Sequence, residues 1–205
     1  MSPLPRITIV TPNLNGERFL EETLNSVISQ DYPNLEYIVV DGGSQDGSLN
    51  IIQKYRKFIS LLIIEKDNGL YSALQKGFRN STGWIMGWIN SDDVLQTKSL
   101  FALSDIFSIN TSIHWLQGYP TVIDEIGRIV YSRSHIWSKF FFFLNLYKGG
   151  SFIQQESTFW TRELWDKSGA FISDRYKYAG DFELWMRFFR FEQMYLTKKI
   201  GRAHV

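Results

Sequence analysis

Short apolar segments rich in β-branched residues alternate with helical segments through the first 95 residues of the chain. The strand-like segments are 6–10, 35–40, 61–64 and 84–89, and apolar residues recur at helical spacing in 17–30, 49–58 and 70–78. This alternation predicts an α/β fold, in which helices cover both faces of a doubly wound, mostly parallel sheet. We expect 61–64 to be a buried strand, Asn15 to cap the first helix, and Asp46 or Ser48 to cap the second.

The pattern changes in the second half of the chain. We expect a helix at 97–107, strands at 114–122 and 128–131, a short strand near 152–153, and helices at 162–167 and 181–191. The aromatic segment 137–143 favours a partly buried helix, and contact with a lipid surface is the alternative. Because no linker or repeat divides residues 1–199, we expect them to form one domain.

Composition narrows the choice of partners. The formal net charge is +1, so the chain has no basic field for nucleic acid. It contains no cysteine, and its three histidines lack metal-ligand spacing, so a bound metal would be a hard cation with oxygen ligands, Mg²⁺ or Mn²⁺. We see no signal peptide and no apolar run of the about 20 residues that span a membrane, and we expect a cytoplasmic protein.

The last six residues, 200–205, differ in character from the rest of the chain. Their sequence, IGRAHV, resembles an in-frame translation of a common sequencing adapter. We therefore expect 200–205 to be a non-native tail, and the natural protein to continue beyond about Lys199.

Acidic residues follow three of the strand-like segments, and they are Asp41, Asp67, Asp92 and Asp93. We expect them in one crevice, because open α/β sheets bind ligands at the carboxyl ends of their parallel strands. Asp92 and Asp93 repel each other unless a cation or solvent screens them, so they either hold Mg²⁺ or Mn²⁺ or form a solvated pair before a helix. Asp41 and Asp67 either contact a nucleoside or stabilise their own turns.

The second half carries further candidates. Asp181 opens an amphipathic helix, where capping is the role that the residue alone favours. Arg187 is expected at the surface or paired with Glu183. The amides and rings of 154–160 suit a sugar, and an ordinary connection between a strand and a helix is an equal alternative.

Six motifs together resemble glycosyltransferase family 2, whose members have the GT-A fold and transfer a sugar from a nucleotide-sugar with inversion. The motifs are 9–15 (IVTPNLN), 39–48 (VVDGGSQDGS), 67–71 (DNGLY), 90–93 (NSDD), 155–160 (QESTFW) and 180–187 (GDFELWMR). The family often has acids at the positions of Asn90 and Gly180 and aspartate at Ser72, and these departures leave open which of Asp92 and Asp93 is the main metal ligand.

The resemblance implies a role for each matching position. The nucleotide, usually a uridine diphosphate, would contact Thr11, Pro12, Asn13, Asp41, Asp67 and Asp92. Asp92 and Asp93 would hold Mn²⁺ or Mg²⁺, and Asp181 would be the catalytic base. The sugar or acceptor would contact Gln155, Glu156 and Trp160.

The resemblance therefore implies a metal-dependent inverting glycosyltransferase of the hexosyltransferase type. Its acceptor would be a hydroxyl of a glycan or lipid-linked sugar in bacterial cell-wall or polysaccharide biosynthesis, with peripheral contact at the inner face of the membrane as a further expectation. A non-catalytic nucleotide-sugar-binding domain is the main alternative. A dinucleotide-dependent oxidoreductase would need a Gly-x-Gly-x-x-Gly loop, whereas 11–16 contains a single glycine.

Overall fold

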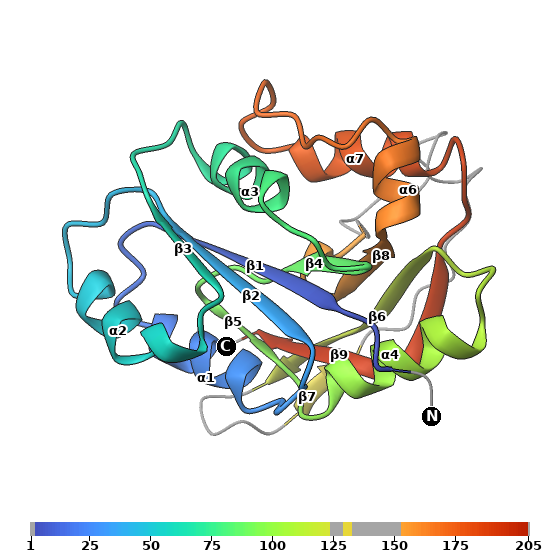
Figure 1. The fold of residues 1–205 in the computed structure, drawn as a ribbon, viewed down its shortest axis with the longest axis horizontal. Helices are drawn as coiled ribbons and strands as arrows, with labels where there is room; N and C mark the ends of the chain where they lie inside the picture. The colour runs from blue at the N-terminus through green and yellow to red at the C-terminus, as the bar shows by residue number, and fades with distance from the viewer. Residues whose placement is uncertain (1–2, 124–128, 133–152, 205) are drawn as a thin grey trace.

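The described residues form one mixed sheet with helices on both faces (Figure 1). The structure is a computed structural model that describes residues 3–123, 129–132 and 153–204. Its nine strands lie in the order β3-β2-β1-β4-β8-β6-β9-β5, and β7 pairs with β6 beside this path. The predicted α/β fold with a doubly wound sheet is confirmed.

The first half of the chain builds the parallel part of the sheet. Strand β1 (Ile7–Asn13) pairs with both β2 (Leu35–Asp41) and β4 (Ile85–Trp88), and β2 pairs with β3 (Leu61–Ile64). The connections contain α1 (Leu20–Ile28), α2 (Ser48–Lys54), the 3₁₀ helix η1 (Arg56–Phe58) and α3 (Leu70–Arg79). All three pairings are parallel, so the carboxyl ends of the four strands lie along one edge.

The second half adds strands of mixed direction. These strands are β5 (Asp93–Leu95), β6 (Trp115–Ile123), β7 (Ile129–Ser132), β8 (Thr158–Thr161) and β9 (Tyr195–His204). The helices are α4 (Ser99–Ile109), the 3₁₀ helix η2 (Gln155–Ser157), α6 (Arg162–Lys167) and α7 (Gly180–Phe188). Strand β8 runs antiparallel to β4 and β6, and it carries the sheet from its parallel part into the second half.

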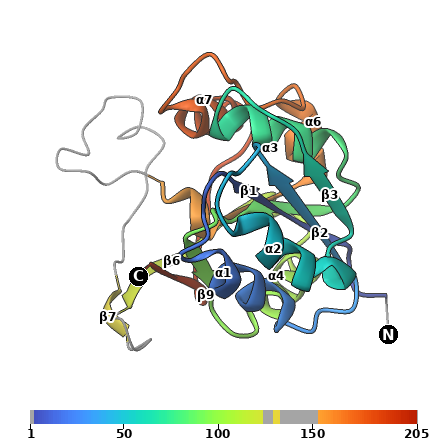
Figure 2. The ribbon, with the colours of Figure 1, turned by 90° about the vertical axis from the view of Figure 1, so that its left-hand side faces the viewer.

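Two apolar cores hold the layers together. Figures 1 and 2 show α3, α6 and α7 above the sheet and α1, α2 and α4 below it. The upper core contains four fully buried tryptophans whose rings contact one another, Trp88, Trp115, Trp160 and Trp185. The lower core is mostly aliphatic. Fully burying an aromatic or aliphatic side chain stabilises a fold by about 1.5–3 kcal/mol, so these two layers are the main source of stability.

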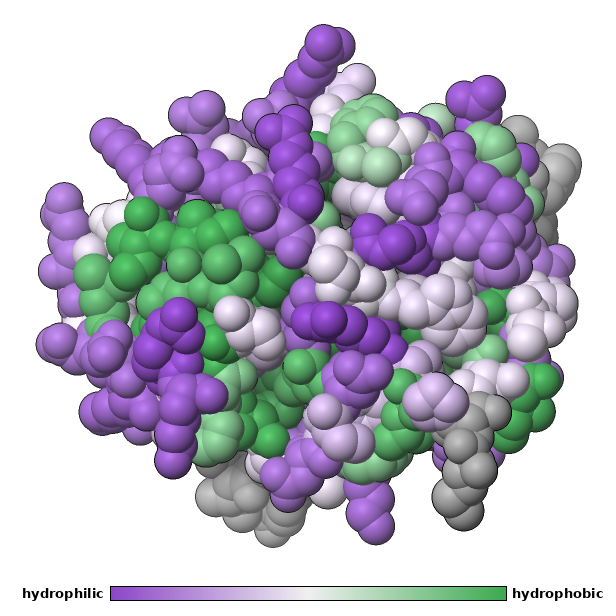
Figure 3. Space-filling view, in the orientation of Figure 1, coloured by the Kyte–Doolittle hydropathy of each residue, from purple (hydrophilic) through white to green (hydrophobic). Residues whose placement is uncertain are grey.

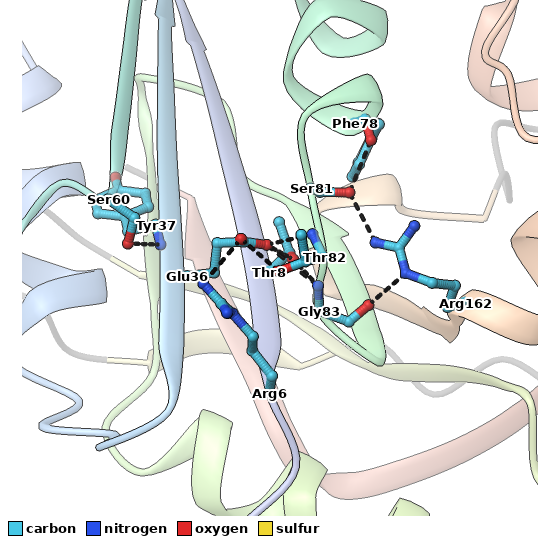
Figure 4. Close-up of polar contacts among 10 residues, drawn as sticks. All are labelled: Arg6, Thr8, Glu36, Tyr37, Ser60, Phe78, Ser81, Thr82, Gly83 and Arg162. Carbon is cyan, nitrogen blue, oxygen red and sulfur yellow. Dashed lines mark hydrogen bonds and ion pairs between the residues drawn. The ribbon is translucent and has the colours of Figure 1, made fainter.

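A buried glutamate ties together the amino-terminal ends of the strands (Figure 4). Glu36 accepts hydrogen bonds from the Thr8 hydroxyl, from both the backbone N–H and the hydroxyl of Thr82, and from Gly83 N–H, and it pairs with Arg6 at 3.0 Å. Burial raises the pKa of Glu36. The hydrogen bonds from Thr8 and Thr82 and the charge of Arg6 lower this pKa by more, so it lies below its ordinary value. This network lies at the edge opposite to the strand-end acids, so its role is structural.

Several local predictions need correction. Helix α1 begins at Leu20, and the Asn15 side chain does not cap it but accepts a hydrogen bond from Gln45 N–H. The residue before α2 is Gly47, which has no side chain to cap the helix. The Asp46 carboxylate accepts a hydrogen bond from the backbone N–H of Ser48, the first residue of α2. Segment 61–64 is the edge strand of the sheet that the described residues form; Leu61, Leu62 and Ile63 are half-buried, and Ile64 is 55% exposed. Figure 3 shows this apolar area on the left.

The carboxyl-terminal residues differ from expectation in their placement. Strand β9 continues through His204, pairs with β5 and β6, and buries the Ile200 side chain completely. That 200–205 are a non-native tail stays a prediction. The aromatic segment 137–143 and residue 152 lie outside the described residues, and among the residues that are described no helix combines the length and apolar character needed to cross a membrane.

Candidate functional site

Polar side chains gather where the parallel strands end. Asn13 and Asp41 are the last residues of β1 and β2 and lie opposite each other in register. Asp67 follows β3 by three residues, and the 90–93 turn follows β4. The predicted convergence of strand-end acids is therefore present at the level of the backbone. The surroundings of each side chain decide what it can do.

Asp41 is completely buried and its carboxylate is fully engaged. Oδ2 accepts hydrogen bonds from the Asn13 amide at 2.7 Å and the Ser44 hydroxyl at 2.7 Å, and Oδ1 accepts from the backbone N–H groups of Gly43 at 3.0 Å and Ser44 at 2.8 Å. Of the two roles that the sequence left open for Asp41, this geometry favours the turn-stabilising one. Its carboxylate shapes the loop that a nucleotide would meet.

Two loops at this edge are cross-linked by reciprocal hydrogen bonds. Asn15 N–H donates to the Ser44 hydroxyl at 2.8 Å, and Gly16 N–H donates to the Ser48 hydroxyl at 3.0 Å. In return, the side chains of Asn15 and Glu17 accept from backbone N–H groups of the second loop at 2.8 and 2.9 Å. Residues 13–17 and 44–48 thus form one rigid platform. The sequence analysis gave Ser44 no role of its own and Ser48 only that of a possible helix cap, although both lie inside the 39–48 motif.

The residues before Asn13 point into the protein. Thr11 is fully buried and its hydroxyl lies 3.0 Å from that of Tyr37, which belongs to the lower core. Pro12 is buried too. Thr11 and Pro12 were predicted to contact the nucleotide; the structure shows that their side chains are buried, and the contact itself stays a prediction. The reason is that both lie inside β1, whose side chains alternate between two covered faces.

Asp67 packs against Gly42 and lies three residues before the start of α3. Its Oδ1 accepts from Gly69 N–H at 2.8 Å. Its Oδ2 lies so close to Gly42 that a Cβ atom there would be 2.6 Å away. Asp67 is half-buried, so it serves its own turn while part of its carboxylate remains open to solvent. Both roles that the sequence suggested for Asp67 remain compatible with this position.

The two adjacent acids after β4 have opposite surroundings. Asp92 is exposed, whereas Asp93 is 1% exposed and is the first residue of β5, held in the sheet by β9. Asp92 still belongs to the turn, whereas Asp93 already belongs to the strand, and this separates the surroundings of the pair. Asp93, predicted as a metal ligand with Asp92, therefore lies in the interior. Asn90 beside them is half-buried, and its Oδ1 has no hydrogen-bond partner among the residues that the structure describes.

These side chains can hold a divalent cation only together with a bound nucleotide, whose phosphates supply further ligands. Among the described residues, no three Asp, Glu or His side chains converge on a single point. Mg²⁺ and Mn²⁺ sites that involve nucleotides need just one or two protein carboxylates, because phosphate oxygens and water complete the shell. The exposed Asp92 meets this requirement, and the neighbouring Asn90 Oδ1 is a second oxygen without a partner.

Asp181 is joined to the strand-end region by a tyrosine. It lies in the first turn of α7, is half-buried, and its Oδ1 accepts a hydrogen bond from the Tyr71 hydroxyl at 2.9 Å. Tyr71 lies in the first turn of α3, four residues after Asp67. Gly180 makes this contact possible, since a Cβ atom there would lie 2.7 Å from the Tyr71 ring. The glycine that departs from the family pattern thus has a steric reason.

The predicted sugar-binding residues do not form one surface. The Trp160 ring is completely buried among the other tryptophans, so it is a core residue and cannot stack on a sugar; its position on β8 explains this. Gln155 and Glu156 lie in η2 and are half-buried. The Gln155 Oε1 has no hydrogen-bond partner in the described part of the chain. Only these two of the three stay candidates for contact with a sugar.

The fold and the strand-end platform define an α/β protein of the GT-A class. The chain belongs to glycosyl transferase family 2, because the model of that family matches residues 8–159. This finding confirms the resemblance that the sequence motifs carried.

Individual relatives agree with this assignment. An uncharacterized glycosyltransferase of Rickettsia prowazekii is 29% identical over 96% of this chain and 62% of its own length. The putative teichuronic acid biosynthesis glycosyltransferase TuaG of Bacillus subtilis is 33% identical over 43% of this chain and 36% of its own length. The chain thus spans about three fifths of the first of these relatives.

Solved structures share the fold at low identity. The S. aureus TarS 1–349 complex with UDP-GlcNAc superposes with a TM-score of 0.77 at 17% identity, covering 98% of this chain and 59% of that one. The mannosyltransferase PcManGT from Pyrobaculum calidifontis, in complex with GDP-Man and Mn²⁺, superposes with a TM-score of 0.69 at 18% identity, covering 99% of this chain and 57% of that one. At such identities the likeness establishes the fold alone.

Proposed function

We propose that this chain is the catalytic domain of an inverting, metal-dependent glycosyltransferase that uses a nucleotide-sugar donor, most simply a UDP-sugar. The observation that carries the proposal is the placement of Asp181. Its carboxylate is half-buried and is held through one oxygen by Tyr71, which lies in the first turn of α3, the helix that follows β3. A positioned carboxylate next to a nucleotide-binding strand edge is what a single-displacement transferase requires as its base.

The donor would lie across the carboxyl ends of β1, β2 and β4. The platform of 13–17 and 44–48 offers rigid backbone, Asp67 offers a half-exposed carboxylate for the base or ribose, and Asp92 would lie next to the diphosphate. The structural neighbours bind UDP-GlcNAc in one case and GDP-Man in another, so a nucleotide-sugar is the shared chemistry. The uridine base rests on the family resemblance and is part of the proposal.

Asp92 would hold Mn²⁺ or Mg²⁺ together with the donor phosphates. When bound, the cation neutralises the negative charge that builds up on the diphosphate leaving group. Asp93, in contrast, keeps the 90–93 turn in place from inside the protein. We therefore assign the metal to Asp92 and a structural role to Asp93.

The chemical step is one displacement. Asp181 accepts the proton of an acceptor hydroxyl while the oxygen of that hydroxyl attacks the anomeric carbon. The bond from that carbon to the diphosphate oxygen breaks at the same time, and the diphosphate leaves with the electron pair. Attack from the face opposite the leaving group inverts the anomeric configuration. No covalent intermediate with the protein forms.

The acceptor is proposed to be a hydroxyl of a glycan or lipid-linked sugar, at the inner face of a bacterial membrane. The relative named for teichuronic acid biosynthesis supports a cell-wall polysaccharide. Gln155 and Glu156 are the residues that we propose for contact with the sugar or acceptor, because the Gln155 Oε1 is buried without a partner.

The deciding experiment combines titration calorimetry and donor hydrolysis. We expect UDP to bind the folded chain in the presence of Mn²⁺ and more weakly without it, and UDP-GlcNAc to release UDP. Arms with GDP and GDP-mannose identify the base if UDP fails. Binding without turnover, for every donor and with glycan acceptors added, would favour a non-catalytic nucleotide-sugar-binding domain. Failure of a folded chain to bind any of these nucleotides would refute the proposal.

A further inference from the structure

A hydrogen bond between two helices far apart in the sequence connects the proposed base to the donor side of the site. Tyr71 and Asp181 are 110 residues apart, yet the Tyr71 hydroxyl donates to Asp181 Oδ1 at 2.9 Å. Tyr71 is 6% exposed and belongs to the upper core. A buried hydroxyl that donates to a carboxylate makes a charge-assisted bond, which is stronger than a neutral one. This bond restricts where the carboxylate can point.

The surroundings of the hydroxyl determine the direction of its proton. In this contact the Tyr71 hydroxyl is the donor, and an oxygen of the Asp181 carboxylate is the acceptor. Burial raises the pKa of Tyr71 above its usual range, and the adjacent Asp181 carboxylate raises it as well, so the hydroxyl stays protonated at neutral pH.

The position of the Tyr71 ring is set by its neighbours on both helices. A Cβ atom at position 180 would lie 2.7 Å from the ring and 2.6 Å from the Ser173 carbonyl oxygen, so only glycine allows the ring to lie against the start of α7. Two residues before Tyr71, Gly69 N–H donates to Asp67, whose other oxygen lies against Gly42. Tyr71 thus lies in the first turn of a helix whose preceding turn packs against Gly42, next to the carboxyl end of β2.

Helix α7 is held firmly at its other end too. Arg187 forms two hydrogen bonds with Glu183 at 2.8 and 2.9 Å and donates to the Ser168 and Phe171 carbonyl oxygens. The predicted pairing of Arg187 with Glu183 is confirmed. Because Arg187 fixes the helix to the preceding turn, the carboxylate of Asp181 retains little freedom beyond its own side-chain rotation, and Tyr71 restrains that rotation.

We propose that Tyr71 is a positioning residue for the glycosyl transfer: it holds Oδ1 of Asp181 so that Oδ2 is presented to the acceptor hydroxyl, and it links that carboxylate to the Asp67 turn on which the donor lies. The inference rests on the proposed function of Asp181 as the base. Within the described ranges, Oδ2 of Asp181 receives no hydrogen bond, and this leaves it available to the acceptor.

The test compares two phenylalanine variants. Tyr71→Phe keeps the ring against Gly180 and removes only the hydroxyl. Tyr32→Phe is the matched control, because Tyr32 is 4% exposed and its hydroxyl donates to the Pro5 carbonyl oxygen at 2.6 Å, away from the strand ends. For UDP release from UDP-GlcNAc, we expect Tyr71→Phe to lower kcat at least tenfold while KM and the Kd for UDP change less than twofold. Tyr32→Phe should lower the melting temperature by about as much as Tyr71→Phe does, but it should leave kcat, KM and the Kd for UDP unchanged.

A double-variant cycle separates this inference from the proposed function. In the Asp181→Asn background, Tyr71→Phe should lower kcat no further, because the group that the hydroxyl positions is already gone. Equal kcat for Tyr71→Phe and wild type, with Asp181→Asn inactive, would overturn the positioning role while leaving Asp181 as the base. If wild type shows no turnover, the melting temperatures of wild type, Tyr71→Phe, Asp181→Ala and the double variant still decide, because Asp181→Ala removes the acceptor of the Tyr71 hydroxyl: additive losses would show that the two side chains are not coupled.

Discussion

The Asn13 amide donates to the Asp41 carboxylate across 2.7 Å, from the last residue of one strand to the last residue of its parallel neighbour. Both side chains are buried, and the same amide lies 3.1 Å from the Ser44 hydroxyl. This contact fastens the two loops that begin at these strand ends. A nucleotide would therefore meet a surface that is organised before it binds, which lowers the cost of ordering the loops on binding.

The first prediction follows from this contact. Asn13→Ala should lower the free energy of unfolding by about 2 kcal/mol, because a hydrogen bond to a buried charged group is lost. It should also weaken UDP binding by loosening both loops. Urea unfolding and calorimetry measure the two effects. Asn80→Ala, which removes an exposed amide bonded to a carbonyl of its own helix, is the control and should change neither. Unaltered stability of Asn13→Ala would show that the platform does not depend on this bond.

The second prediction separates the two adjacent acids. Asp92→Ala should abolish the effect of Mn²⁺ on UDP binding while changing the unfolding free energy by less than about 0.5 kcal/mol, as is usual for exposed positions. Asp93→Ala should instead destabilise the chain by about 2 kcal/mol, because it removes a buried hydrogen-bonding group. Asp105→Ala, an exposed acid on α4, serves as the control for charge. If metal dependence is lost only in Asp93→Ala, then Asp93 is the metal ligand and the assignment to Asp92 is wrong.

The third prediction concerns the base. Asp181→Asn should retain UDP binding and reduce the rate of donor turnover by about 10²–10⁴-fold, the range that a general base contributes. Asn keeps the shape of the side chain and still accepts from Tyr71, so the fold should persist. Asp174→Asn, an exposed acid of the preceding loop, should retain full turnover. Parallel loss of binding and rate in Asp181→Asn would mean that Asp181 holds the donor and does not act as the base.

The fourth prediction uses the pH dependence of stability. The pKa of Glu36 is lowered in the folded state, so its contribution is present above the unfolded value of about 4.3 and is lost as pH falls through the lower folded value. Glu36→Gln should therefore cost about 2 kcal/mol at pH 7 and much less at pH 3. Glu22→Gln, on the exposed face of α1, should leave the pH profile unaltered. Urea unfolding at both pH values checks this, and a cost that does not vary with pH would exclude an ionised Glu36 network.

Sequence periodicity was sufficient for the order of elements but not for every boundary. The four parallel strands and their helices were predictable because each has a local apolar pattern that its own residues carry. Strand β8 was not, because Thr158–Thr161 has no period of its own and becomes a strand through pairing with β4 and β6. The expected burial of 61–64 was wrong for a similar reason, since the position of a strand within a sheet is not encoded in that strand.

The sequence by itself determined the family, the α/β class and the strand ends at which the acids stand, because motifs and apolar periods are properties of neighbouring residues. Only the tertiary structure decided what each acid can do. The Asp41 carboxylate accepts hydrogen bonds from Asn13 and Ser44. Asp93 is buried, whereas Asp92 is exposed. Asp181 accepts a hydrogen bond from the Tyr71 hydroxyl. These outcomes depend on partners that the fold brings from distant parts of the chain, and burial and hydrogen bonding by such partners determine the reactivity of a carboxylate.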